Sequence, residues 1–275
     1  MIKRLDIIAL LILFYSLFSP FIEAQNNRTY DTSLVLIKEG TLKMGSKSGE
    51  KDEKPTRRIK INSFYLSKFE ISNIEFAFFL NTKGNQIGGN SIWLNLDGEW
   101  NNLKCRIYLK DSIFLVEKGF EYYPVNFVSW YAANEYCKWK GGRLPSEAEW
   151  EFASKGGVLF KRKYEMNKTE IDDYAWYNLN SENSWHKSGQ KKPNLAGLYD
   201  IFGNLWEWCS DFYDVNYYKI RPNKNPQGPQ TGDYRVVRGG SWSNGPEMLS
   251  SSNRNALNPN TNKINLGFRI AFDAK

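Results

Sequence analysis

The sequence predicts an α+β fold with few helices, short strands and many loops. Glycine, asparagine and proline recur throughout residues 158–275, and because these residues favour turns, regular elements there must be short. Helix start signals occur at three places. The chain has 16 Tyr and 10 Trp among 275 residues. Such side chains suit a loop-rich core, since they bury large areas while keeping a polar tip.

The N-terminus has the pattern of a secretory signal peptide. Lys3 and Arg4 precede an apolar stretch at 7–22, and Ala24 is a small residue at the expected cleavage site. The stretch is shorter than the roughly 20 residues that a spanning helix needs. We therefore expect residues 1–24 to be a signal peptide and 25–33 a polar lead-in. We expect export to the periplasm, cell envelope or outside; an uncleaved anchor would give the only membrane contact.

Residues 34–275 show no internal repeat or long linker, so we expect one domain. Its first strand is predicted at Leu34–Ile37, and residues 40–44 lead into a turn-rich loop at 45–49. Strand pieces follow at 59–61 and 64–66, where apolar and β-branched residues are frequent.

Three helices are predicted from their capping residues. Ser72 with Glu75, and Ser146 with Glu149, have the spacing of capping boxes. Ser129 precedes an aromatic stretch that a pair of glycines ends at 141–142. Between the first two helices, residues 84–121 alternate tryptophan, glycine and charge, which is typical of hairpins.

Charge and cysteine content limit the function classes. The formal net charge is +7, but the lysines and arginines are spread along the sequence, so we expect a solvated surface and no nucleic-acid partner. Cys105, Cys137 and Cys209 lack the C-x-x-C spacing, and we expect buried structural thiols. An exported protein can pair two of them, which leaves their disulfide state open.

Several sequence blocks together carry a family resemblance. They are YPVN at 123–126, GRLPSEAEWE at 142–151, GLYDIFGNLWEW at 197–208, RVVRGGSW at 235–242 and GFR at 267–269. In this order and spacing the chain resembles the sulfatase-modifying-factor or formylglycine-generating-enzyme-like family over residues 34–272. The resemblance implies an irregular C-type-lectin-like fold.

Within the third region, two carboxylates lie seven residues apart. Asp200 and Glu207 flank Gly203 and Leu205, whose backbone carbonyl groups add neutral oxygens. Such oxygen ligands suit calcium, and the resemblance implies that these four residues hold a calcium ion. The alternative is a turn whose carboxylates cap backbone amides.

The loop between the last two blocks, residues 243–264, contains no cysteine. In the oxidases of the family this loop carries two thiols that hold copper, and counting from the glycine pair places them at Asn244 and Leu249. Neither residue is a soft sulfur ligand, so we expect no copper. One histidine, His186, excludes a two-histidine zinc site within the chain.

We therefore expect no catalytic residues and a non-catalytic binding or structural module, a pseudoenzyme whose partner is an envelope protein or peptide. Some relatives of this kind act in gliding motility and secretion. The alternative is a formylglycine-generating oxidase or another enzyme with an unrecognised site. Structural ion pairs are expected for Arg143 and Arg269. The predicted partner surface comprises Asn244, Asn253, Arg254 and Asn255, since polar loops of this kind suit recognition.

Overall fold

The computed structural model describes residues 33–157 and 170–274. The predicted signal peptide and nearly all of the polar lead-in lie outside these ranges. Within them, no helix combines the length and the apolar character that crossing a bilayer requires.

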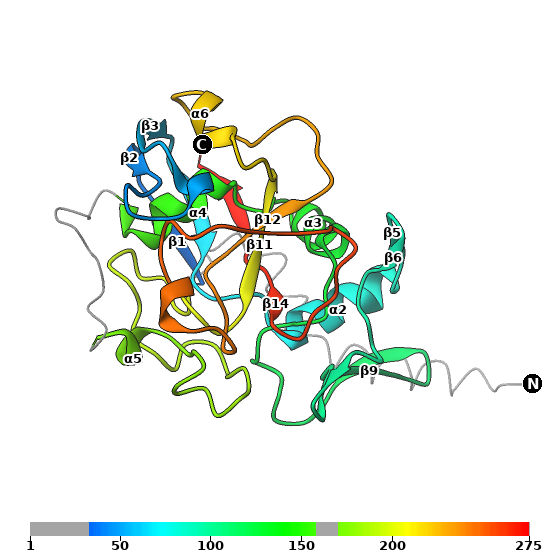
Figure 1. The fold of residues 1–275 in the computed structure, drawn as a ribbon. Coiled ribbons are helices and arrows are strands. Elements are labelled where there is room, and N and C mark those ends of the chain that lie inside the picture. Colours follow the sequence, from blue (N-terminus) through cyan, green and yellow to red (C-terminus); the bar gives the residue numbers. More distant parts are fainter. Residues whose placement is uncertain (1–32, 158–169, 275) are drawn as a thin grey trace, which may run out of the picture. The chain divides into compact units, whose positions relative to one another are not determined.

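The helices are few and short, as the sequence predicts (Figure 1). Ser72 precedes the first with its backbone N–H bonded to Glu75, Ser129 caps the second, and Ser146 with Glu149 forms the capping box of the third. The helices are α2 (Asn73–Lys83), α3 (Trp130–Trp139), α4 (Glu147–Ser154), α5 (Ile171–Tyr174) and α6 (Tyr217–Ile220), with 3₁₀ turns η1 (Lys51–Glu53) and η3 (Pro246–Met248).

The strands form several small sheets rather than one large one. The central sheet has the order β13 (Asn255–Leu257), β12 (Arg235–Arg238), β11 (Trp206–Phe212) and β14 (Leu266–Gly267), with β11 and β14 parallel. A second sheet joins β1 (Leu34–Ile37), β4 (Phe64–Ser67) and β15 (Ala271–Asp273). β2 (Gly40–Met44) pairs with β3 (Arg57–Ile61), a hairpin whose first strand the sequence did not predict.

The stretch 84–121 forms three successive hairpins, which confirms the prediction made from its alternating composition. They are β5 (Ile87–Gly88) with β6 (Ser91–Ile92), β7 (Glu99–Trp100) with β8 (Leu103–Lys104), and β9 (Ile107–Lys110) with β10 (Ile113–Val116). Asn81 of α2 exchanges two hydrogen bonds with the backbone of Phe114, which holds the last hairpin on that helix.

Two clusters of buried side chains make up the core. One lies around α2 and α3 and includes stacked aromatic rings such as Phe79 on Trp93. The other lies around α4 and the first strands and includes Trp150. Cys105, Cys137 and Cys209 are buried free thiols, in agreement with their predicted structural role. Burial raises the pKa of Cys105 to about 11 and that of Cys137 well above its usual value, so both are protonated and unreactive at neutral pH.

Candidate functional site

The loop 243–264 leaves the central sheet through a tight glycine turn. Gly239 and Gly240 both have positive φ, and a Cβ on Gly240 would lie 2.4 Å from Leu249. Two backbone hydrogen bonds, from Gly203 to Gly239 and from Trp242 to Asn204, tie this turn to the segment that contains Asp200. The segment 200–207 and the start of the loop are therefore linked directly by backbone hydrogen bonds.

Asn244 lies at the first position to which the count from the glycine pair assigns an oxidase thiol. Its amide oxygen accepts hydrogen bonds from Trp206 Nε1 at 2.9 Å and from the Ser241 hydroxyl at 2.7 Å. Asn265 donates to the same Ser241 hydroxyl from the other end of the loop. At the second position, Leu249 is 5% exposed and packs in the core. These positions provide a fixed polar group and an apolar contact.

A groove opens beside Trp242. It encloses about 350 Å³ and is lined by Glu99, Trp100, Phe127, Trp242, Ser243, Asn262, Lys263, Ile264 and Asn265. Trp100, from the β7–β8 hairpin, is 47% exposed and meets Trp242 edge to face at 5.6 Å. The Trp242 Nε1 atom is buried and has no hydrogen-bond partner among the described residues. The groove thus pairs aromatic walls with polar groups, as ligand sites do.

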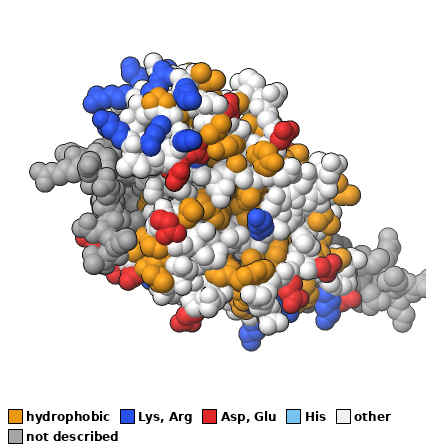
Figure 2. Space-filling model, viewed as in Figure 1, with side chains coloured by type: hydrophobic (Ala, Val, Ile, Leu, Met, Phe, Trp, Pro, Cys, Tyr) orange, Lys and Arg blue, Asp and Glu red, His pale blue; other side chains and the backbone are white. Residues whose placement is uncertain are grey.

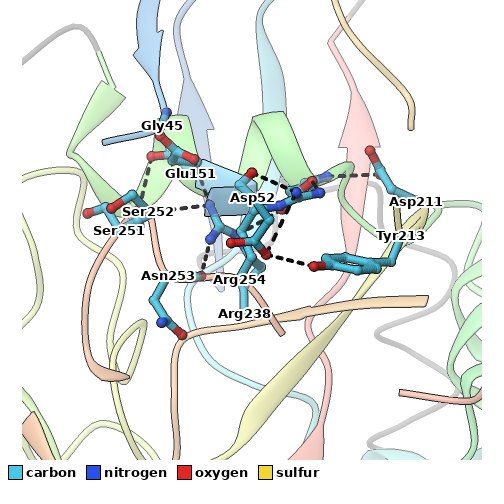
Figure 3. A network of polar contacts seen from close by, with 12 residues as sticks. Gly45, Asp52, Glu151, Asp211, Tyr213, Arg238, Ser251, Ser252, Asn253 and Arg254 are labelled. Atoms are coloured by element: carbon cyan, nitrogen blue, oxygen red, sulfur yellow. Dashed lines mark hydrogen bonds and ion pairs between the residues drawn. The ribbon is translucent and has the colours of Figure 1, made fainter. Parts of the chain in front are cut away.

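Behind the loop lies a buried network of charges (Figure 3). Arg238 of β12 pairs with Glu151 of α4 at 2.7 Å, and Glu151 also binds Lys155. Burial alone raises the pKa of Glu151, but these two cations outweigh it and the pKa is lowered. Burial and the nearby Glu147 charge raise the pKa of Asp211 to about 7.

The structure corrects the expected role of Arg254. Its guanidinium is fully buried, forms two hydrogen bonds with Glu147 at 2.6 and 2.9 Å, and donates to the Asp52 carbonyl. A side chain held in this way is not available to a partner. The reason lies in the tertiary structure. Residue 254, just before β13, packs against α4, where Glu147 supplies the carboxylate that a buried arginine requires.

The other predicted surface residues are dispersed. Asn255 is exposed on β13, whereas Asn253 is half-buried and its backbone carbonyl accepts from Arg238. Asn244 adjoins the groove through Ser243. Of the four residues, Asn244 is thus the one beside the cavity. The groove's other walls, Trp100 and Phe127, come from segments that the sequence did not link to the loop.

The arginines of the motif blocks form ion pairs, as expected. Arg143 bridges Glu149 and Asp273. Arg269 donates a hydrogen bond to each carboxylate oxygen of Glu207, at 2.6 and 2.7 Å.

Of the four predicted calcium ligands, Asp200, Gly203 and Leu205 lie in the turn before β11, and Glu207 is the second residue of that strand. Glu207 is engaged, because its carboxylate also accepts from Trp150 Nε1 at 2.8 Å. Asp200 is different: one oxygen accepts from the Gly189 N–H, and the other is buried with no partner in the described chain. A buried carboxylate oxygen that has no hydrogen-bond partner is available to coordinate a hard cation. Asp200 therefore fits calcium, while Glu207 is already committed to Arg269.

Glu70 is a further carboxylate at this place, missed because it is far away in the sequence. It accepts hydrogen bonds from Leu205 N and from the Asn204 side chain. Burial, together with the charges of Asp200 and Glu207, raises its pKa well above the usual value. Burial likewise raises the pKa of Asp200 to about 6. The three carboxylates thus share the charge of one arginine, Arg269, but no three His, Cys, Asp or Glu side chains of the described residues are arranged to hold a metal ion together.

Comparisons with known proteins agree with this architecture. A family model for the sulfatase-modifying factor enzyme 1-like domain matches residues 20–274. The formylglycine-generating enzyme of Streptomyces coelicolor is 29% identical over 287 residues, which covers 87% of this chain and 89% of that enzyme. Among solved structures, PvdO from Pseudomonas aeruginosa superimposes with a TM-score of 0.71 at 22% identity, covering 88% of this chain and 94% of that one.

The fold and these matches define a C-type-lectin-like domain of the formylglycine-generating-enzyme type. The chain belongs to the sulfatase-modifying factor enzyme 1-like domain family. A further relative is the serine/threonine-protein kinase pkn1 of Chlamydia caviae, which is 35% identical over 250 residues. That match covers 89% of this chain but 38% of the kinase, so the chain spans about two fifths of that relative's length.

Proposed function

We propose that this chain is an exported, non-catalytic binding module whose ligand, an envelope protein or peptide, lies in the groove beside Trp242. The observation that carries the proposal is which residues occupy the two positions where the oxidases are expected to have thiols. Asn244 is locked by Trp206 and Ser241, and Leu249 is part of the core. Cuprous copper needs soft sulfur ligands, which neither residue supplies. The loop nevertheless borders a groove with an aromatic wall.

The groove favours an extended peptide with an apolar side chain. Trp100 and Trp242 offer a large aromatic contact area. Glu99 and Lys263 bring opposite charges to the same lining, so the amide dipoles and charges of a peptide find complementary groups there. The Asn244 amide nitrogen donates to no residue of the described chain and is free to bind a carbonyl.

The first test separates a binding module from an oxidase. We expect the purified chain to retain no cuprous copper against a chelator and to leave a thiol-containing peptide unoxidised in air. Metal analysis and mass spectrometry of the peptide measure the two quantities. Stoichiometric copper together with turnover of the peptide would establish the oxidase instead.

The same proposal predicts where a partner crosslinks. A photo-crosslinking amino acid at Lys263, in the groove, should capture an envelope component, and Trp100→Ala should reduce the yield about tenfold or more, the loss expected when a central aromatic contact is removed. Ile87, which is 76% exposed and outside the groove, gives the control site. Equal capture from both sites would show that the groove is not the binding surface.

We further propose a calcium ion at Asp200, with the carbonyl groups of Gly203 and Leu205 as the resemblance implies. The orphaned Asp200 oxygen supports this proposal. Calcium would supply positive charge among Glu70, Asp200 and Glu207. Its role would be structural, since this turn is bonded to the glycine pair at the start of the loop.

Calcium should therefore stabilise the folded chain. At about a hundredfold excess over Kd, binding adds about 2.7 kcal/mol to the free energy of unfolding, which is about 5 °C or more in Tm for a domain of this size. Asp200→Asn should abolish the shift, and Asp97→Asn, at an exposed carboxylate, should keep it. Thermal unfolding with calcium and with chelator measures both, and a wild-type Tm unmoved by calcium would refute the site.

A further inference from the structure

Lysines and arginines that are spread along the sequence gather on one face of the domain. Figure 2 shows them together over the region that Figure 1 labels β2 and β3. Residues 40–61 and 214–225 contain ten Lys or Arg and four Asp or Glu, and two of those acids, Asp52 and Glu53, are buried. We call the exposed cations Lys43, Arg58, Lys60 and Lys224 the basic face. The sequence showed no concentration of charge, because two separate segments supply it.

Strand register places these four side chains on one side. Lys43 and Arg58 are directly opposite each other in the β2–β3 ladder. Lys60 is two residues beyond Arg58 and therefore points the same way. On the other edge of β3, Lys60 exchanges two backbone hydrogen bonds with residues 223 and 225, which sets Lys224 beside it. The inward side of the hairpin is apolar, with Leu42 and Ile59 in the core.

The basic face is not neutralised from within. None of its four cations forms an ion pair with a carboxylate of the described residues. Like charges directly opposite each other in a ladder are destabilising. By contrast, Arg143, Arg238, Arg254 and Arg269 all have carboxylate partners. An unpaired array of this kind fits an anionic partner outside the chain.

An apolar side chain protrudes beside these cations. Arg57, at the start of β3, donates to the backbone carbonyls of Lys219 and Arg221, so the backbone at the intervening Ile220 is held next to the start of this strand. Ile220 is 73% exposed, and Val215, just before α6, is 45% exposed. Exposed apolar groups next to lysines are the composition of surfaces that lie on a bilayer, where phosphates attract the cations and the apolar group enters the headgroup boundary.

We propose that the basic face docks on a bilayer that contains anionic phospholipid, with Ile220 inserted. A nucleic-acid backbone would also bind the cations, but it offers no apolar site for Ile220. The face also lies at the start of the domain, since β2 begins seven residues after the last residue of the polar lead-in. This proposal does not depend on the groove. It gives the chain a contact with the membrane besides the one that an uncleaved N-terminal segment would make.

The first experiment follows Ile220 itself. Because the three native cysteines are buried, Ile220→Cys can be labelled selectively with an environment-sensitive fluorophore in the full chain. Its emission should shift to the blue on vesicles of phosphatidylcholine with phosphatidylglycerol, not on phosphatidylcholine alone, and about 0.5 M salt should reverse the shift. Leu179→Cys, equally exposed at 73% in the loop after α5, is the control and should not respond.

The second experiment removes the charges. Neutralising Lys43, Arg58 and Lys60 to glutamine should weaken the binding of the labelled chain to anionic vesicles about a hundredfold, at roughly fivefold per cation. The matched control neutralises Lys104, Lys110 and Lys118, exposed cations on the other hairpins or just after them, and should change binding less than about twofold, because it leaves the basic face intact.

The N-terminal segment is present in every variant, so it cannot produce these differences. An Ile220 label that ignores anionic vesicles, or equal losses in the two triple variants, would overturn the proposal. If duplex DNA moves the label as strongly as the vesicles do, the partner is a polyanion in general and the bilayer assignment is wrong.

Discussion

Arg254→Ala is expected to lower the free energy of unfolding by about 3–5 kcal/mol, because it leaves a buried carboxylate without its partner. Glu147 is almost completely buried and accepts two hydrogen bonds from Arg254. Arg238 also approaches Glu147, at 3.6 Å, but its shorter contact is with Glu151. The remaining cation is therefore already in use and cannot fully compensate.

Urea denaturation of the two proteins at neutral pH measures the difference. The matched control is Lys138→Ala, which removes a pair with Glu135 whose side chains are 60% and 43% exposed. Such surface pairs contribute about 0–1 kcal/mol. A loss for Arg254→Ala as small as that of the control would mean that the guanidinium is not structural, and would restore the ligand role that the sequence suggested.

Gly203→Ala is expected to lower the free energy of unfolding by about 2–4 kcal/mol. Gly203 has a φ of +76°, which costs alanine about 1 kcal/mol. A Cβ there would also lie 2.1 Å from the backbone carbonyl oxygen of Trp176. A backbone atom cannot swing away as a side chain does, so relieving the overlap shifts the chain and adds about 1–3 kcal/mol.

Gly141→Ala separates the two contributions. Its φ of +78° is nearly the same, but a Cβ there meets nothing within 4 Å. The control should therefore lose only about 1 kcal/mol in the same denaturation experiment. Equal losses at the two glycines would show that the contact with Trp176 imposes no strain.

The consequence of Gly203→Ala should extend to the loop. The Gly203 N–H donates to Gly239, and the neighbouring Asn204 accepts from Trp242, so displacing this turn displaces the floor of the groove. Trp176 in turn stacks on the ring of His186, at 3.7 Å between centroids. The ring of His186 is thus fixed by stacking on Trp176 and by a hydrogen bond between its Nε2 atom and the Ser181 carbonyl.

Local signals predicted the first three α-helices, most of the early strands and the hairpins, but not α5, α6 or the strands of the central sheet. The helices begin after Ser72, Ser129 and Ser146, because a capping side chain and the backbone groups that it satisfies lie within one turn of each other. The three hairpins of 84–121 also depend on neighbours in sequence. β2 was not predicted as a strand, since its pairing with β3 is made across a loop of twelve residues.

The groove could not be predicted in the same way. Trp100, Phe127 and Trp242 come from three distant segments, and only their packing brings them to one cavity. The same holds for Glu70, which reaches the Asp200 turn across 135 residues to bond Leu205. Arg254 looked like a surface residue because its loop is polar, whereas the carboxylate that buries it is on α4.

By itself, the sequence determined the family, the helix caps and the residues at the two thiol positions, since each of these is a property of residue identity and spacing. Only the tertiary structure decided which charges are buried and which remain free. Arg254 became part of the core because Glu147 lies opposite it. Lys43, Arg58 and Lys60 became one exposed face because strand pairing sets side chains from separate segments side by side, and the electrostatic energy of a charge depends on its neighbours in space.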